Sequence, residues 1–142
     1  AADPIGINVF SGKDKATVVT DTGIISDDIL HRIDDSTLLV LEANYDPHML
    51  RFGPYQLFLK QRVASDEGHL SNEMAAQALL MMKRPDFMQV ILAHRSENNN
   101  NAVLVTQTIG KMLVDGGVRI GPEMKLQHGQ PNEIVSMQSI KR

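Results

Sequence analysis

The sequence predicts an α/β fold in which a sheet is layered against helices. Compact apolar runs at 37–41 and 87–93 have the length and composition of strands that are covered on both faces. Segments 73–83 and 102–114 place their apolar residues at helical spacing. Strand-like and helix-like segments alternate along the chain, which is the pattern typical of layered α/β proteins.

The chain begins with a predicted hairpin. Residues 5–10 alternate apolar and polar side chains, and the turn residues 11–14 lead into a second strand at 16–20. A short helix at 26–33 follows. Ser26 is a good N-cap for it, and acidic residues come next, at the positive end of the helix dipole.

Strands and helices then alternate to the end of the chain. In order, the predictions are a strand, a helical turn, two helices, a strand, a helix and two short strands: 37–41, 46–50, 54–63, 73–83, 87–93, 102–114, 125–128 and 133–138. Pro54 and Ser71 are typical of helix starts, and Gly116-Gly117 of a helix end. No repeat or linker interrupts this order, so residues 1–142 are predicted to form one domain.

Composition narrows the class of protein. The chain has 142 residues, 42% of them hydrophobic and 22% charged, which indicates a soluble globular domain. A net charge of −3 argues against a broadly basic nucleic-acid surface but leaves room for a local basic groove. With no cysteine, any metal must be held by His, Asp or Glu, which suits zinc or manganese. No signal peptide or membrane-length apolar run is found, so we expect a cytoplasmic location and no membrane partner.

Two residues at predicted strand ends are candidates for a metal site. Asp21 follows the strand at 16–20, and its carboxylate has two oxygens that can bridge two cations. His94 follows the strand at 87–93, and a neutral imidazole is a common metal ligand. Taken singly, Asp21 is more typical of a turn that caps its own backbone, and His94 is more typical of a simple strand exit.

Two further segments carry polar side chains near predicted element ends. Ser71 and Asn72 open a helix whose free backbone N–H groups favour an anion such as phosphate, and His69 before them is a candidate either for a proton donor or for a residue that supports a metal ligand. A plain N-cap with a surface histidine is the alternative. Glu42 or Asp46 could orient a ligand histidine, although a solvated loop fits those two residues equally well.

Five short motifs follow one another in a particular order. They are Asp21-Thr22-Gly23, Leu41-Glu42-Ala43-Asn44-Tyr45-Asp46, Leu59-Lys60-Gln61-Arg62, Gly68-His69-Leu70-Ser71-Asn72-Glu73 and Ala93-His94-Arg95-Ser96-Glu97-Asn98-Asn99. This series resembles the metallo-β-lactamase superfamily and, within it, the YycJ-like subgroup, over roughly residues 1–120. Each motif alone is weak, whereas five in order form a specific signal.

The resemblance implies the C-terminal half of an αββα sandwich, with a mixed sheet, flanking helices and two divalent metal ions at one edge. It implies hydrolysis of a phosphodiester by a metal-bridging hydroxide, with DNA as the expected substrate because YycJ-like proteins are associated with exonuclease action. Asp21 takes the place of the bridging aspartate and His94 that of the last histidine ligand. His69 is assigned a catalytic role, and Ser71 and Asn72 are assigned to substrate binding.

The departures from the family pattern predict a missing part. The family motif His-x-His-x-Asp-His is absent from these residues, Tyr45 stands where the subgroup often has His, and Arg95 where it often has Leu. Two protein ligands do not complete a two-metal site, and half a sandwich leaves one sheet face uncovered. We therefore expect a companion N-terminal half, as a separate chain, a cleaved precursor or a second copy, and no activity from this chain alone.

Three hypotheses follow. The leading one is a metal-dependent phosphodiesterase or exonuclease that needs its N-terminal half. The second is a non-catalytic binding module that kept the fold and lost the metals. The third, compatible with the first, is a fragment of a longer enzyme, which the absence of an initiator Met also fits.

Overall fold

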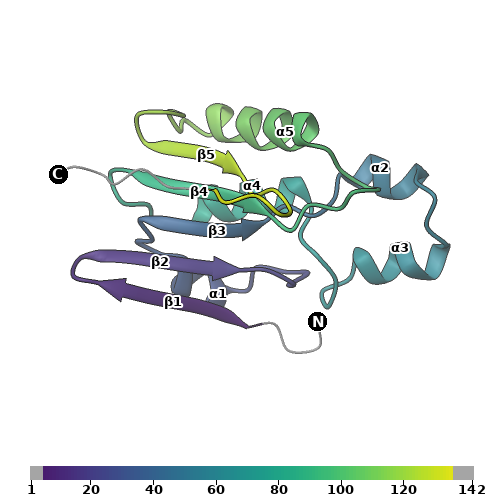
Figure 1. Cartoon of the computed structure of the whole chain (residues 1–142), viewed down its shortest axis with the longest axis horizontal. Coiled ribbons are helices and arrows are strands. Elements are labelled where there is room, and N and C mark those ends of the chain that lie inside the picture. The colour runs from purple at the N-terminus through teal and green to yellow at the C-terminus, as the bar shows by residue number, and fades with distance from the viewer. Residues whose placement is uncertain (1–4, 136–142) are drawn as a thin grey trace.

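The computed structural model describes residues 5–135, which contain one five-stranded mixed sheet (Figure 1). Its strands, in both chain order and spatial order, are β1 (Gly6–Ser11), β2 (Asp14–Val19), β3 (Leu38–Glu42), β4 (Met88–Ala93) and β5 (Met124–His128). β1 and β2 form an antiparallel hairpin, and β2 to β5 are mutually parallel. The four parallel strands therefore present their carboxyl ends at one edge, where α/β proteins place their sites.

Five helices accompany the sheet in the described part of the chain: α1 (Asp27–Ile33), α2 (Pro47–Phe52), α3 (Leu57–Val63), α4 (Asn72–Met81) and α5 (Ala102–Asp115). Apolar residues of α1, α4 and α5 pack with the sheet into one core. In contrast, α2 and α3 lie beyond the carboxyl ends of the strands, at the right of Figure 1. No helix of residues 5–135 has the length and apolar character needed to cross a membrane.

The two faces of the sheet differ in how well they are covered. Leu39 of β3 pairs in register with Thr17 of β2 and Val90 of β4, and all three are buried. One residue further along, Val18 pairs with Val40, and Val18 is 37% exposed. Because successive side chains of a strand point to opposite faces, the helices cover one face and leave the other partly open. This arrangement agrees with the predicted half sandwich.

Side-chain caps explain where most helices begin. The side chains of Ser26, Asp46, Ser71 and Asn101 each accept a hydrogen bond from a backbone N–H three residues later. Such a bond satisfies one of the free donors at a helix start. The predicted starts at Ser26 and Ser71 are thereby confirmed.

The helical turn predicted at 46–50 is confirmed as the helix α2, whereas two other predictions were wrong. The helix expected from Pro54 begins only at Leu57. The reason is that Gly53 is extended, as a residue before proline prefers, so the chain bends before α3. Residues 133–135 do not form the strand predicted at 133–138: they have no regular secondary structure, and Ile134 is 98% exposed. Residues 136–138 lie outside the described part.

Candidate metal centre

Four titratable side chains meet at the carboxyl edge of the sheet. Glu42 is the last residue of β3, His94 follows β4 directly, and Asp21 lies just beyond β2. His69 arrives from the loop between α3 and α4. Parallel strands bring residues that are far apart in sequence to the same edge, so the topology itself assembles this cluster.

One carboxylate oxygen of Glu42 is hydrogen-bonded to both histidines. Glu42 Oε1 lies 2.7 Å from His69 Nδ1 and 2.8 Å from His94 Nδ1. The two rings meet edge to face, with their centroids 5.1 Å apart. Asp21 Oδ1 lies 3.6 Å from His94 Nδ1 and 3.9 Å from His69 Nδ1. Asp21, His69 and His94 can each offer one ligand atom within 4.8 Å of the others.

The Glu42 side chain has no exposed surface, yet its hydrogen bonds favour the ionised carboxylate. Burial acts to raise its pKa, but the hydrogen bonds from His69 and His94 act against burial and leave the pKa below its ordinary value. The backbone N–H of Thr22 also donates to Glu42 Oε2, at 3.3 Å. A buried charge is stable only when it is paired and hydrogen-bonded in this way.

The ionised state of Glu42 fixes the tautomer of both histidines. A carboxylate can only accept hydrogen bonds, so each Nδ1 carries the proton that it donates to Glu42. The Nε2 atom of a neutral ring is then a free lone pair. This carboxylate–histidine arrangement is the usual way in which proteins orient a metal-ligating histidine.

Two of these residues have left-handed backbone conformations, which set the direction of their side chains. Asp21 has φ of 60° and His94 has φ of 53°, in a region that non-glycine residues rarely occupy. The side chain of Asn44 donates to the carbonyl of His94 at 2.7 Å and so helps to hold this conformation. Local strain of this kind is concentrated at functional sites.

Two glycines let the neighbouring loop approach. A Cβ on Gly23 would lie 2.0 Å from the carbonyl oxygen of Ser65, and a Cβ on Gly68 would lie 2.2 Å from that of Val63. Gly23 also donates its N–H to the carbonyl of Asp66, at 3.1 Å. These contacts bring the loop that carries His69 against the strand end that carries Asp21.

The residues assigned to substrate binding have structural partners. Ser71 is buried and accepts a hydrogen bond from the Met74 N–H at 3.2 Å, which caps α4. Asn72 is fully buried and exchanges two hydrogen bonds with Asn100, of 3.1 and 2.8 Å. Neither contact tests whether these residues bind substrate, so that assignment stays a prediction.

The structure settles one alternative and adds two residues. Of Glu42 and Asp46, Glu42 contacts the histidines, whereas the Asp46 side chain accepts from the Met49 N–H and caps α2. Sequence reasoning gave no role to Asn44 or Asn100. Asn44 stands two residues after Glu42, and the strand-end position of this segment was the available signal.

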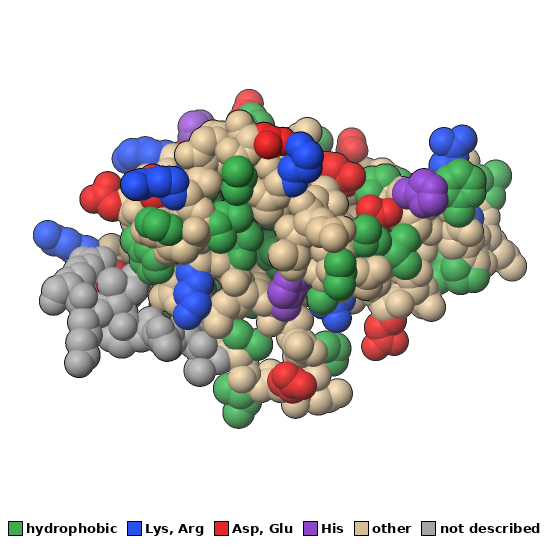
Figure 2. Space-filling view, turned by 90° about the horizontal axis from the view of Figure 1, so that it is seen from above, with side chains coloured by type: hydrophobic (Ala, Val, Ile, Leu, Met, Phe, Trp, Pro, Cys, Tyr) green, Lys and Arg blue, Asp and Glu red, His purple; other side chains and the backbone are tan. Residues whose placement is uncertain are grey.

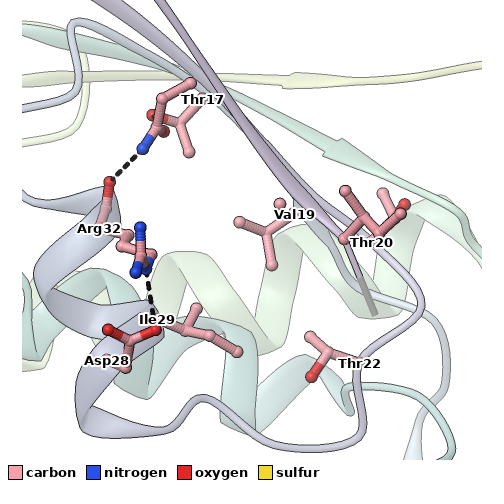
Figure 3. Close-up of a pocket in the computed structure, with 10 residues that line it drawn as sticks. Thr17, Val19, Thr20, Thr22, Asp28, Ile29 and Arg32 are labelled. Carbon is pink, nitrogen blue, oxygen red and sulfur yellow. Dashed lines mark hydrogen bonds and ion pairs between the residues drawn. The ribbon is translucent and has the colours of Figure 1, made fainter. Parts of the chain in front are cut away.

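Two cavities lie in the described part near these elements. One of about 470 Å³ opens beside His94 and is lined by Arg95, Glu97 and residues 129–131. Burial lowers the pKa of His128, and the positive charge of Arg95 lowers it further. The other, of about 320 Å³, lies between the β1–β2 hairpin and α1 (Figure 3). There Arg32 is turned toward Asp28, at 2.8 Å, and the cavity contains none of the four clustered side chains.

The cluster offers a donor set that fits a divalent metal ion. Two imidazole nitrogens and one carboxylate oxygen are the ligands of many zinc sites that keep an open position for water. The mixed sheet with its helices agrees with half of a metallo-β-lactamase sandwich. Fold and cluster together therefore point to that class.

Comparison with known proteins supports the same class. The chain is 31% identical to the exodeoxyribonuclease YycJ of Bacillus anthracis over 140 residues, which are 99% of this chain and 53% of that protein. It is 33% identical to the exodeoxyribonuclease WalJ of Streptococcus pneumoniae serotype 2 (strain D39) over 132 residues, 92% of this chain and 49% of that protein. No protein-family model and no solved structure matches the chain.

The chain is thus a homologue of the YycJ and WalJ exodeoxyribonucleases, which are metallo-β-lactamase-fold proteins. The resemblance that the ordered motifs suggested is confirmed. The chain spans about half the length of the curated relatives it matches.

Proposed function

We propose that this chain is part of a metal-dependent phosphodiesterase that hydrolyses DNA as an exonuclease. The observation that carries the proposal is the pairing of His69 and His94 with one oxygen of the buried Glu42, beside Asp21. A carboxylate that served only in a surface ion pair would remain exposed, whereas Glu42 is fully buried. The relatives' names, which specify exodeoxyribonucleases, support the choice of DNA.

The proposed roles follow from the chemistry of each side chain. Asp21 and His94 hold divalent metal ions, zinc or manganese, two of them in the complete site. When bound, such ions lower the pKa of water and stabilise negative charge on phosphoryl oxygens. Glu42 keeps the Nε2 atom of His94 as a lone pair. His69, on the same carboxylate oxygen as His94, acts as the acid in its doubly protonated form: Nε2–H gives its proton to the leaving oxygen, while Nδ1–H stays hydrogen-bonded to Glu42.

The proposal includes a companion N-terminal half, as a separate chain, a cleaved precursor or a second copy. Asp21, His69 and His94 form the one group of three possible ligands found among residues 5–135, and a two-metal site needs more. The partly open sheet face around Val18 and Val40 is apolar, which suits a second layer. The chain alone is then expected to be inactive.

Metal binding and hydrolysis test the proposal together. Purified chain is loaded with Zn²⁺ or Mn²⁺, analysed for bound metal, and assayed on end-labelled DNA with and without an N-terminal half that carries His-x-His-x-Asp-His. We expect metal in the chain, hydrolysis only in the combined sample, and loss of both in Asp21→Asn. Asp46→Asn is the matched control, because Asn caps a helix as well as Asp does.

Two results would overturn the proposal. Hydrolysis that persists in Asp21→Asn with metal bound would remove Asp21 from the mechanism. A well-folded chain that takes up neither metal would instead favour the metal-free binding module.

A further inference from the structure

The α2–α3 hairpin carries large apolar side chains that face solvent. Phe52 at the end of α2 is 67% exposed, and Leu57 and Phe58 in the first turn of α3 are 72% and 66% exposed. The hairpin has its own small core of Tyr45, Leu50 and Val63, with further residues packed against it. The exposed side chains are therefore not needed to hold the hairpin together, and an exposed apolar cluster marks an interaction site.

The same hairpin is basic in an acidic protein. Residues 47–64 contain Arg51, Lys60 and Arg62 and no Asp or Glu, whereas the whole chain has a net charge of −3. Figure 2 shows hydrophobic, basic and histidine side chains gathered at the right-hand end of the molecule, over α2. The charge of this surface complements a polyanion rather than the rest of the protein.

Cations and aromatic rings are interleaved on this surface. The Arg51 guanidinium lies over the Phe52 ring, 5.4 Å from its centroid, and the His48 ring lies 4.6 Å from the same ring. Lys60 donates to the carbonyl of Arg51 at 2.8 Å, which ties α3 to α2. Aromatic faces flanked by cations are how proteins bind unpaired bases and the phosphates between them.

The hairpin is also joined to the metal centre at both ends. The chain enters α2 from Glu42 through Tyr45, and it leaves α3 toward His69. A bridge between Tyr45 and Ser71 and a hydrogen bond from the Asp46 N–H to the Asn99 carbonyl, at 2.8 Å, fix its base. The base of the hairpin is therefore fixed next to the segments that carry Glu42 and His69.

We propose that the α2–α3 hairpin binds unpaired nucleotides of single-stranded DNA, with Phe52 stacking on a base and Arg51 contacting phosphate. The choice of DNA rests on the proposed function, while the binding itself needs no metal and no hydrolysis.

Binding to a fluorescent dT12 oligonucleotide, measured by anisotropy in EDTA with the 142-residue chain, tests this surface. Stacking is worth about 1–3 kcal/mol per base, so Phe52→Ala should weaken binding by about 5- to 150-fold. Arg51→Gln should lower the slope of log K against log salt by about 0.7, because one phosphate contact is lost. An abasic strand of the same length should bind wild type and Phe52→Ala alike.

Phe10→Ala is the matched control. Phe10 is 68% exposed on β1 and has its own cation, with Lys15 Nζ 5.9 Å from its ring centroid, but Asp14 stands in the same hairpin. We expect this change to leave dT12 binding unaltered.

Three results would overturn the inference: no measurable dT12 binding by the wild-type chain, equal binding by Phe52→Ala, or an equal loss in Phe10→Ala. A change of oligomeric state in Phe52→Ala without DNA, seen by sedimentation, would show instead that the surface joins copies of the chain. Because all measurements are made in EDTA, they stand apart from any failure of metal-dependent hydrolysis.

Discussion

Leu41 and Glu42 are neighbours at the end of β3, and both have no exposed surface, yet burial of the two side chains rests on different interactions. Leu41 lies in the core that the sheet shares with α1, α4 and α5, where an apolar side chain stabilises the fold by about 1.5–3 kcal/mol. Glu42 brings a charge into the same protein interior, which costs free energy unless that charge is paired. Here two histidines and the Thr22 N–H provide the pairing.

The contrast shows where the fold ends and the site begins. Up to Leu41, β3 places apolar side chains in the core, which stabilises the fold. From Glu42 onward the strand ends carry a buried carboxylate and two residues in left-handed backbone conformations, Asp21 and His94. Proteins break such local rules mainly at functional sites.

Replacing Leu41 with Ala should have the largest effect on the fold. A deleted core leucine costs its transfer free energy and leaves a cavity, so we expect about 2–5 kcal/mol of lost unfolding free energy. Urea unfolding followed by circular dichroism measures it. Val40→Ala, on the partly open face, is the matched control and should cost clearly less. Equal losses would show that the open face is covered as well as the core.

Replacing Glu42 with Gln should affect the site more than the fold. The amide has a similar shape but no charge, and one oxygen is replaced by NH₂, so a single carbonyl oxygen is left for the N–H groups of His69, His94 and Thr22. Loss of such a supporting partner typically weakens metal affinity by 10- to 100-fold. Zinc titration calorimetry measures this, with Asp46→Asn as the control because Asp46 does not contact the histidines. Unchanged affinity in Glu42→Gln would remove Glu42 from the metal site.

The sequence was sufficient to predict the elements of the covered core. The runs at 37–41 and 87–93 and the caps at Ser26 and Ser71 follow local rules of periodicity and hydrogen bonding, and the structure confirms them. The bend before α3 was missed because Pro54 fits both a helix start and the turn before one. Local signals cannot choose between these two outcomes.

The site was predictable only in part. Asp21 and His94 were found because strand ends are where α/β proteins place polar side chains, and the motif order singled out His69. The sharing of one Glu42 oxygen by two histidines could not be predicted, because it depends on the register between β3 and β4 and on the loop held by Gly23 and Gly68. No local pattern in the sequence encodes the distances between the Glu42 oxygen and the two histidine rings.

The smallest effect expected is a pH dependence of stability that comes from the carboxylate–histidine pair in metal-free protein. The pKa of Glu42 lies below its ordinary 4.5, so its contribution is present above pH 4.5 and is lost as pH falls through the lowered value. The hydrogen bond to Glu42 raises the pKa of His94 above its ordinary 6.5, so that contribution is present below pH 6.5 and is lost as pH rises through the raised value.

The two contributions overlap between pH 4.5 and 6.5, so the pair should stabilise the chain most within that window. Urea unfolding in EDTA from pH 4 to 9 should show the unfolding free energy of the wild type exceeding that of His94→Gln by the widest margin there. His31→Gln is the control, because His31 is an exposed histidine at a helix end, away from Glu42. A margin that stays constant across this range would mean that Glu42 and His94 do not share a proton-dependent contact, and the buried carboxylate would then rest on His69 and Thr22 alone.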